Sequence, residues 1–78
     1  MKYKIEITQE DIDRGMRGRS DFCPVALALR RKWPEAEMGC FACDLGNRLV
    51  LVPELVSKFV EDFDSGKPVK PFTFEIEL

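Results

Sequence analysis

The two ends of this chain carry the pattern that most restricts its fold, a strict alternation of polar and apolar residues. Residues 2–8 place on one face Tyr3, Ile5 and Ile7. Residues 72–78 place on one face Phe72, Phe74, Ile76 and Leu78. A period of two predicts a strand with one buried face. We expect the first and last strands to be neighbours, because their other faces carry opposite charges. These charges are Lys2 and Lys4 at the start and Glu75 and Glu77 at the end.

The first half of the interior favours two helices. Thr8 is a typical N-cap residue, and Gly15 is expected to end the short helix that follows it. A mobile polar loop over residues 15–21 leads to a second helix, which begins at Pro24 and stops at Pro34. The apolar stripe of this second helix has helical spacing and consists of Phe22, Val25, Leu29 and Trp33.

The second half favours a hairpin and a longer helix. We expect strands over residues 36–43 and 48–52, joined by turn residues at 44–47. Pro53 opens the helix and Gly66 caps it. Its apolar face consists of Leu55, Val56, Phe59, Val60 and Phe63, and its polar face of Glu54, Ser57, Lys58, Glu61 and Asp62. The order β-α-β-β-α-β predicts an α+β domain with a mainly antiparallel four-stranded sheet and helices on one face.

The length of 78 residues leaves room for one hydrophobic core, so residues 1–78 are expected to form a single domain. No apolar run approaches the roughly 18 residues of a membrane span. The alternating first residues lack the pattern of a secretory signal peptide. We therefore expect a soluble, cytoplasmic protein with no membrane partner.

Charge is distributed unevenly along the chain. The net charge of −2 argues against general nucleic-acid binding. Residues 14–32, however, hold six basic residues and one acidic residue, whereas the rest of the chain holds six basic and thirteen acidic residues. Opposed patches of this kind can steer a chain toward a partner or favour self-association as a homodimer. The alternative is that both patches are ordinary solvated faces.

The absence of histidine restricts the chemistry of the chain. It removes the commonest general base, the usual partner of a serine or cysteine nucleophile, and the commonest metal ligand. The carboxylates Glu61, Asp62 and Asp64 form no pair with a clear proton-transfer role. A glycine-rich phosphate loop is also missing. We therefore expect a protein that is not an enzyme and needs no cofactor.

Three cysteines leave two hypotheses open. Cys40 and Cys43 have the spacing of a zinc or redox pair, and with Cys23 and a fourth ligand they could stabilise a zinc-containing mini-domain. On a strand, however, residues three apart face opposite sides, so the alternative is that they are small core residues. Cys23 precedes a helix start, where the dipole and nearby arginines could lower its pKa and make the thiol reactive.

The loop from Arg14 to Asp21 is a candidate binding site for an anion or phosphate. Its glycines allow backbone amides to turn toward a ligand, and its arginines supply forked donors. Asp21 opposes this hypothesis, since its carboxylate could cap the same amides. Trp33 beside basic residues could stack on a nucleic-acid base, although its register favours the core. The candidate residues for an anion or a partner are Arg14, Arg17, Arg19, Arg30 and Arg31.

Three segments resemble small bacteriophage and prophage proteins of unknown function. They are residues 7–12 (ITQEDI), residues 23–29 (CPVALAL) and residues 63–74, from FDSGK to PFTF. The resemblance implies a mobile-element origin and a cytoplasmic setting in a host cell, and it implies no activity and no site residues.

Together with the charge pattern, this resemblance leads to the hypothesis of a non-enzymatic protein-binding module. Such a module would act as an adaptor or inhibitor of a host or phage protein, docking through an arginine patch and an acidic helix face. An exposed terminal strand could also pair with a second copy or with a partner's sheet edge. The alternatives are a binder of a small anionic ligand or nucleic acid through residues 14–21, and the zinc-stabilised domain.

Overall fold

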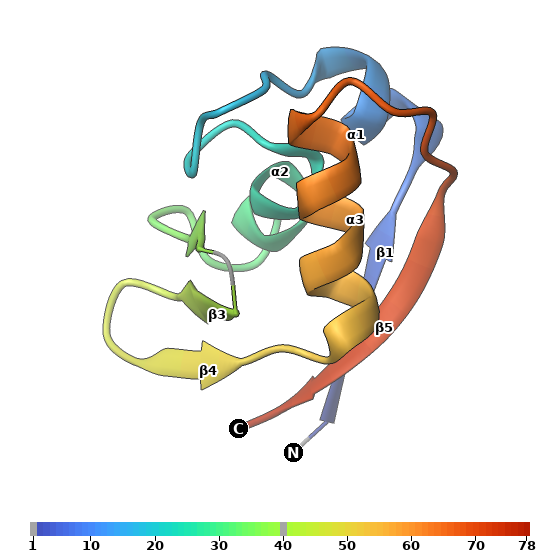
Figure 1. The fold of residues 1–78 in the computed structure, drawn as a ribbon. Helices are drawn as coiled ribbons and strands as arrows, with labels where there is room; N and C mark the ends of the chain where they lie inside the picture. The colour runs from blue at the N-terminus through green and yellow to red at the C-terminus, as the bar shows by residue number, and fades with distance from the viewer. Residues whose placement is uncertain (1, 40) are drawn as a thin grey trace.

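The first and last strands of the chain pair with each other, as their charges predict. In the computed structural model, which describes residues 2–39 and 41–78, β1 (Lys2–Ile7) lies antiparallel to β5 (Phe72–Glu77). The register sets Lys4 opposite Glu75 and Lys2 opposite Glu77, so opposite charges face each other on the outer side. Both termini therefore lie at the same end of the molecule (Figure 1).

A second sheet forms from the middle of the chain. It has the order β2 (Glu37–Met38), β3 (Ala42–Asp44) and β4 (Leu49–Leu51), with both pairs antiparallel. The turn at residues 44–47 is confirmed, because Leu45 donates its backbone N–H to the carbonyl of Arg48 and Gly46 has a φ of 101°. The hairpin prediction is therefore correct for β3 and β4.

The prediction of one four-stranded sheet is not confirmed. The described residues form two sheets of two and three strands, because the segment predicted as one strand over residues 36–43 is divided into β2 and β3. Gly39 donates its N–H to the carbonyl of Ala42, which reverses the chain after only two residues of β2. Helices therefore lie between two sheets rather than on one face of a single sheet.

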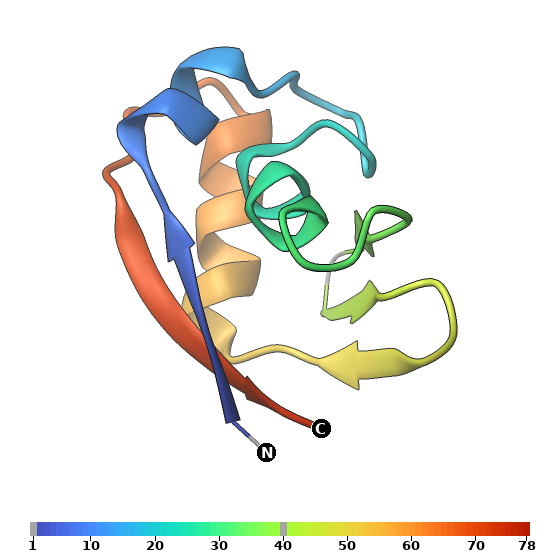
Figure 2. The same ribbon diagram turned by 180° about the vertical axis from the view of Figure 1, so that it is seen from behind.

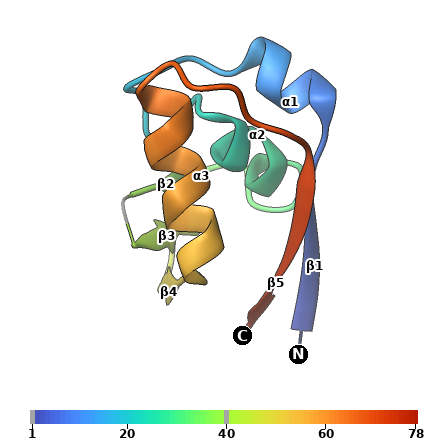
Figure 3. The ribbon, with the colours of Figure 1, turned by 45° about the vertical axis from the view of Figure 1, so that its right-hand side comes forward.

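Three helices complete the α+β domain. They are α1 (Gln9–Arg14), α2 (Pro24–Arg30) and α3 (Glu54–Asp64). Figures 2 and 3 show α2 and α3 between the paired strands β1 and β5 on one side and the strands β2 to β4 on the other. The central residues of the core come from both helices and both sheets: Ile5, Ile7, Val25, Leu29, Met38, Cys43, Val56, Phe59, Phe74 and Ile76.

Local signals define the helix ends. Thr8 and Asp11 form a reciprocal capping box at the start of α1. Gly15 follows that helix and lies against Pro24, so that a Cβ atom there would be 2.7 Å from Cδ of the proline ring. Gly66 has a φ of 81°, and its N–H donates to the carbonyl of Phe63 at the end of α3. In the described part of the chain, no helix is long and apolar enough to cross a membrane.

Candidate functional site

Most of the candidate arginines make contacts within the fold. The side chain of Arg19 reaches both carboxylate oxygens of Asp21 at 3.1 Å and lies over the ring of Phe22. Arg30 donates from Nε to the carbonyl of Ala36 at 2.8 Å. Three of these donors are therefore already used within the fold, which leaves fewer of them to bind an anion or a partner.

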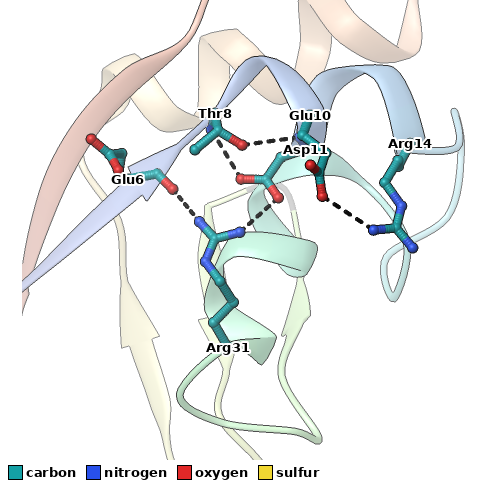
Figure 4. A network of polar contacts seen from close by, with 6 residues as sticks. All are labelled: Glu6, Thr8, Glu10, Asp11, Arg14 and Arg31. Atoms are coloured by element: carbon teal, nitrogen blue, oxygen red, sulfur yellow. Dashed lines mark hydrogen bonds and ion pairs between the residues drawn. The ribbon is translucent and has the colours of Figure 1, made fainter.

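Arg31 and Arg14 belong to a polar network around α1, shown in Figure 4. Arg31 donates to Oδ1 of Asp11 at 2.7 Å and to the backbone carbonyl of Glu6, and it thereby ties α2 to both α1 and β1. Arg14 forms an exposed ion pair with Glu10, one helical turn earlier at 3.2 Å. Arg31 thus stabilises the fold, whereas the Arg14 pair contributes little.

Asp11 is the buried centre of this network, with 6% of its surface exposed. Burial by itself would raise the pKa of Asp11, but the hydrogen bond from Arg31 and those made with Thr8 lower that pKa below its usual value. The carboxylate is therefore held ionised by groups on α1 and α2. The sequence alone did not indicate this role of Asp11, because its main partner lies 20 residues away.

The loop over residues 15–21 is held against the rest of the domain. Gly18 donates its backbone N–H to Oδ1 of Asp64 at 3.0 Å, 46 residues along the chain. The Ser20 hydroxyl donates to Glu37 at 2.9 Å, and the Ser20 carbonyl accepts from the N–H of Met38. The Gly18 amide, which the anion hypothesis needed, thus binds a carboxylate of the same chain.

Arg17 is the candidate arginine that differs from the others. Among the described residues it has no ion pair or hydrogen bond, and its guanidinium lies over Gly66 at the C-terminal end of α3. That end carries the negative pole of the helix dipole, so a cation is favourable there. The structure gives the anion site no further support, and it stays a prediction.

Cys23 and Cys43 are buried free thiols. Cys23 is 2% exposed, and its Sγ accepts a hydrogen bond from the N–H of Ala26 as the N-cap of α2. Burial raises the pKa of both thiols, so the hypothesis of a lowered pKa at Cys23 is wrong. Within residues 2–39 and 41–78, no three potential metal ligands lie together. The pair of Cys40 with Cys43 involves a residue outside the described residues.

Trp33 belongs to the margin of the core. It is partly buried, and its ring packs edge to face on Tyr3 with centroids 5.4 Å apart. This contact joins the end of α2 to β1 and supports the core alternative. The base-stacking hypothesis gains nothing from the geometry.

A groove beside α3 is the site that the fold does assemble. It consists of two hollows that share Val60 and Asp64 as lining residues. The first hollow, of about 220 Å³, is lined by the loop at residues 18–20 and by Met38. The second hollow, of about 350 Å³, lies beside Phe41. We call these two hollows the α3 groove.

The α3 groove has an apolar floor and an acidic rim. Phe41, just before β3, is 73% exposed and lines the second hollow together with Val60. Glu61 and Asp64 supply carboxylates along the helix, and one oxygen of Asp64 already accepts from Gly18. The groove therefore suits a ligand that combines an apolar group with positive charge.

Sequence analysis found the acidic helix face but missed Phe41. This residue was expected inside a strand over residues 36–43, where its side chain would be one of an alternating set. Gly39, four positions before Cys43, was the available signal that the strand turns there.

Comparison of the chain with family models, with curated proteins and with solved structures finds no match to any of them.

Proposed function

We propose that this chain is a non-enzymatic protein-binding module that holds a short segment of another protein in the α3 groove. The observation that carries the proposal is Phe41, a large aromatic side chain left 73% exposed beside an apolar hollow. Exposed aromatic residues next to a pocket are typical anchors of protein interfaces. This surface replaces the arginine patch as the expected docking site.

The acidic rim defines the chemistry of the partner segment. Glu61 and Asp64 lie on α3 within one turn of each other and border the same hollow as Phe41. A segment with one large apolar side chain flanked by arginine or lysine would match this arrangement. In keeping with the resemblance to phage proteins, we expect the segment to belong to a host or phage protein in the cytoplasm.

The groove's own residues favour binding over catalysis. Its only thiol among the described residues, Cys23, is committed to capping α2, and burial raises its pKa. The two carboxylates have no histidine to work with, since the chain contains none. The groove therefore offers recognition groups without an activated nucleophile.

A peptide library displayed on phage particles tests the proposal directly. We expect selection on the purified protein to enrich segments in which arginine or lysine flanks a large apolar residue. A synthetic peptide of the selected sequence should bind at least tenfold more weakly to the Phe41→Ser and Glu61→Lys variants by calorimetry. The Glu77→Lys variant makes the same charge change on the outer face of β5 and should bind like the wild type. Enriched peptides without charge bias, or equal affinity for the Phe41→Ser variant, would contradict the proposal.

A further inference from the structure

The strand β4 is an open edge of the three-stranded sheet. It pairs with β3 on one side, and in the part of the chain that is described no backbone hydrogen bond is made on its other side. The opposite edge of the same sheet is covered, because Met38 of β2 donates its N–H to the carbonyl of Ser20. In Figure 1, β4 lies at the lower margin of the sheet β2 to β4, on the side away from β2, and the C-terminal end of the chain passes below its right-hand end.

The register of the hairpin shows which backbone groups face this edge. Bonds from Leu45 N–H to Arg48 and from Val52 N–H to Phe41 flank the pair of Cys43 and Val50. Hydrogen-bonded and non-hydrogen-bonded pairs alternate along an antiparallel ladder. Val50 therefore directs its backbone groups toward β3, and the residues on either side of it direct theirs outward.

Those two outward residues are Leu49 and Leu51, whose side chains are 71% and 81% exposed. They are two positions apart in a strand and so project from the same face of the sheet. The strands β1 and β5, by contrast, carry charged residues such as Lys4 and Glu75 on their outer faces. Charged side chains of this kind discourage an edge strand from pairing with a strand of another chain. An edge with free donors and two exposed leucines is the arrangement that favours pairing with another strand.

We infer that β4 pairs with β4 of a second copy, antiparallel, about a two-fold axis at Val50. This register sets Leu49 of each copy opposite Leu51 of the other. The two outward residues of each strand then exchange N–H and carbonyl bonds, giving four hydrogen bonds between the copies. The four leucines meet on one face of a six-stranded sheet that runs through the dimer.

Self-complementarity favours a second copy as the occupant of this edge. In the same register, Arg48 lies opposite Val52 of the second copy, and no like charges are placed opposite each other along β4. The edge is thus complementary to itself in hydrogen bonding and apolar surface, without charge repulsion.

The dimer is expected to be weak. A strand of three residues buries less area than the roughly 1,200 Å² typical of stable interfaces. We therefore expect half-association at a chain concentration on the order of 0.1 mM. Sedimentation velocity across a concentration series should show the wild type approaching twice its monomer mass, 9.0 kDa for one chain.

Two variants and one control locate the interface. The Leu49→Lys and Leu51→Lys variants should remain monomeric at concentrations where the wild type is a dimer. The Leu55→Lys variant removes another exposed leucine, on α3 rather than β4, and should dimerise like the wild type. A wild type that stays monomeric up to about 1 mM would overturn the inference. So would equal loss of dimer in the Leu55→Lys control.

Disulfide cross-linking tests the register itself. Leu49→Cys and Leu51→Cys are made separately, each in a Cys40→Ser background, and the two proteins are mixed under mild oxidation. Directly paired residues have Cα atoms about 5.5 Å apart, which a disulfide can span. Identical residues are offset by two positions along the strands, about 8 Å apart, which it cannot. We expect cross-linked dimer in the mixture and little in either protein alone.

Cross-linking of each protein with itself, or none in the mixture, would overturn the β4 register even if a dimer is present. The inference does not depend on the α3 groove. Peptide binding without dimerisation would retire the β4 interface alone, and dimerisation without peptide binding would retire the groove alone.

Discussion

At the scale of single residues, polar contacts tie together segments that are distant in the chain. Asp11 joins α1, α2 and β1 through Arg31, and Asp64 joins α3 to the loop through Gly18 (Figure 4 shows the first of these). The buried carboxylate of Asp11 is favourable only while it keeps its hydrogen-bond donors. Substitutions at Asp11 should therefore lower the unfolding free energy more than substitutions at exposed residues of the same helix.

The Asp11→Asn variant should lose about 1–2 kcal/mol of unfolding free energy at pH 7. The amide keeps the shape of the side chain but loses the charge-assisted bond to Arg31 and weakens the capping box with Thr8. Urea unfolding followed by circular dichroism measures the difference. Asp13→Asn, an exposed change on the same helix, should stay within 0.5 kcal/mol of the wild type.

The cost of Asp11→Asn should depend on pH. Because the fold lowers the pKa of Asp11, the folded state favours the carboxylate, and its contribution is complete above the unfolded pKa near 4. As the pH falls through the folded pKa, that contribution is lost. The stability difference between wild type and variant should therefore shrink from pH 6 to pH 2. A difference that stays constant over this range would show that Asp11 contributes nothing as an ion.

The buried thiols should react slowly in the folded protein. In a Cys40→Ser background, Cys23 and Cys43 remain, both buried and both with a pKa raised by burial. A thiol reagent at pH 7.5 should modify neither thiol within minutes in buffer, and both at once in denaturant. Fast reaction of one thiol in buffer would restore the reactive-cysteine hypothesis.

At the scale of elements, the close contact between the end of α1 and the start of α2 needs a residue without a side chain. The φ of Gly15 is −66°, which any residue adopts, so its role is steric rather than conformational. A Cβ atom at this position would lie 2.7 Å from Cδ and 2.8 Å from Cγ of Pro24. The first residue of the loop between these helices, Gly15, therefore packs directly against Pro24, the residue that begins α2.

Gly15→Ala should destabilise the domain by about 1–3 kcal/mol through overpacking. A double-mutant cycle with Pro24→Ala identifies the cause, since removing the ring makes room for the new methyl group. The double variant should lose clearly less stability than the sum of the two single losses, as thermal or urea unfolding can measure. Additive losses would mean that the two residues do not compete for the same space.

At the scale of the whole molecule, the β1–β5 pair closes the chain on itself. The two strands come from opposite ends of the sequence, and the rings of Phe72 and Phe59 attach β5 to α3 with centroids 4.7 Å apart. The outer face of this pair is polar, whereas the opposite sheet exposes the leucines of β4. The two sides of the molecule are thus suited to different surroundings, the first to solvent and the second to contact.

Charge reversal across β1 and β5 tests this closure. Lys4→Glu and Glu75→Lys should each destabilise the domain by about 0.2–1 kcal/mol, because each places like charges opposite each other. Combining them restores an opposite pair in the reversed sense, so the double variant should return close to wild-type stability. Lys70→Glu, outside the strands, provides the control for net charge. Failure of the double variant to recover would contradict the register at this pair.

The sequence by itself determined the features that depend on near neighbours. The N-cap at Thr8, the helix start at Pro24, the turn around Gly46 and the αL cap at Gly66 all involve residues within five positions of each other. The alternation in the end strands and their opposite charges also predicted one long-range pair correctly. These signals suffice because each is satisfied by the local backbone or by a repeated pattern along it.

Only the tertiary structure decided how these elements share a core. The turn at Gly39 divides one expected strand and so produces two sheets with helices between them. It also brings Phe41 to α3 and leaves β4 as an open edge. The candidate arginines looked available in the sequence because their partners, such as Asp11 for Arg31, lie many positions away. A charged side chain binds whichever opposite charge the packing brings within reach, and that proximity exists only once the chain has folded.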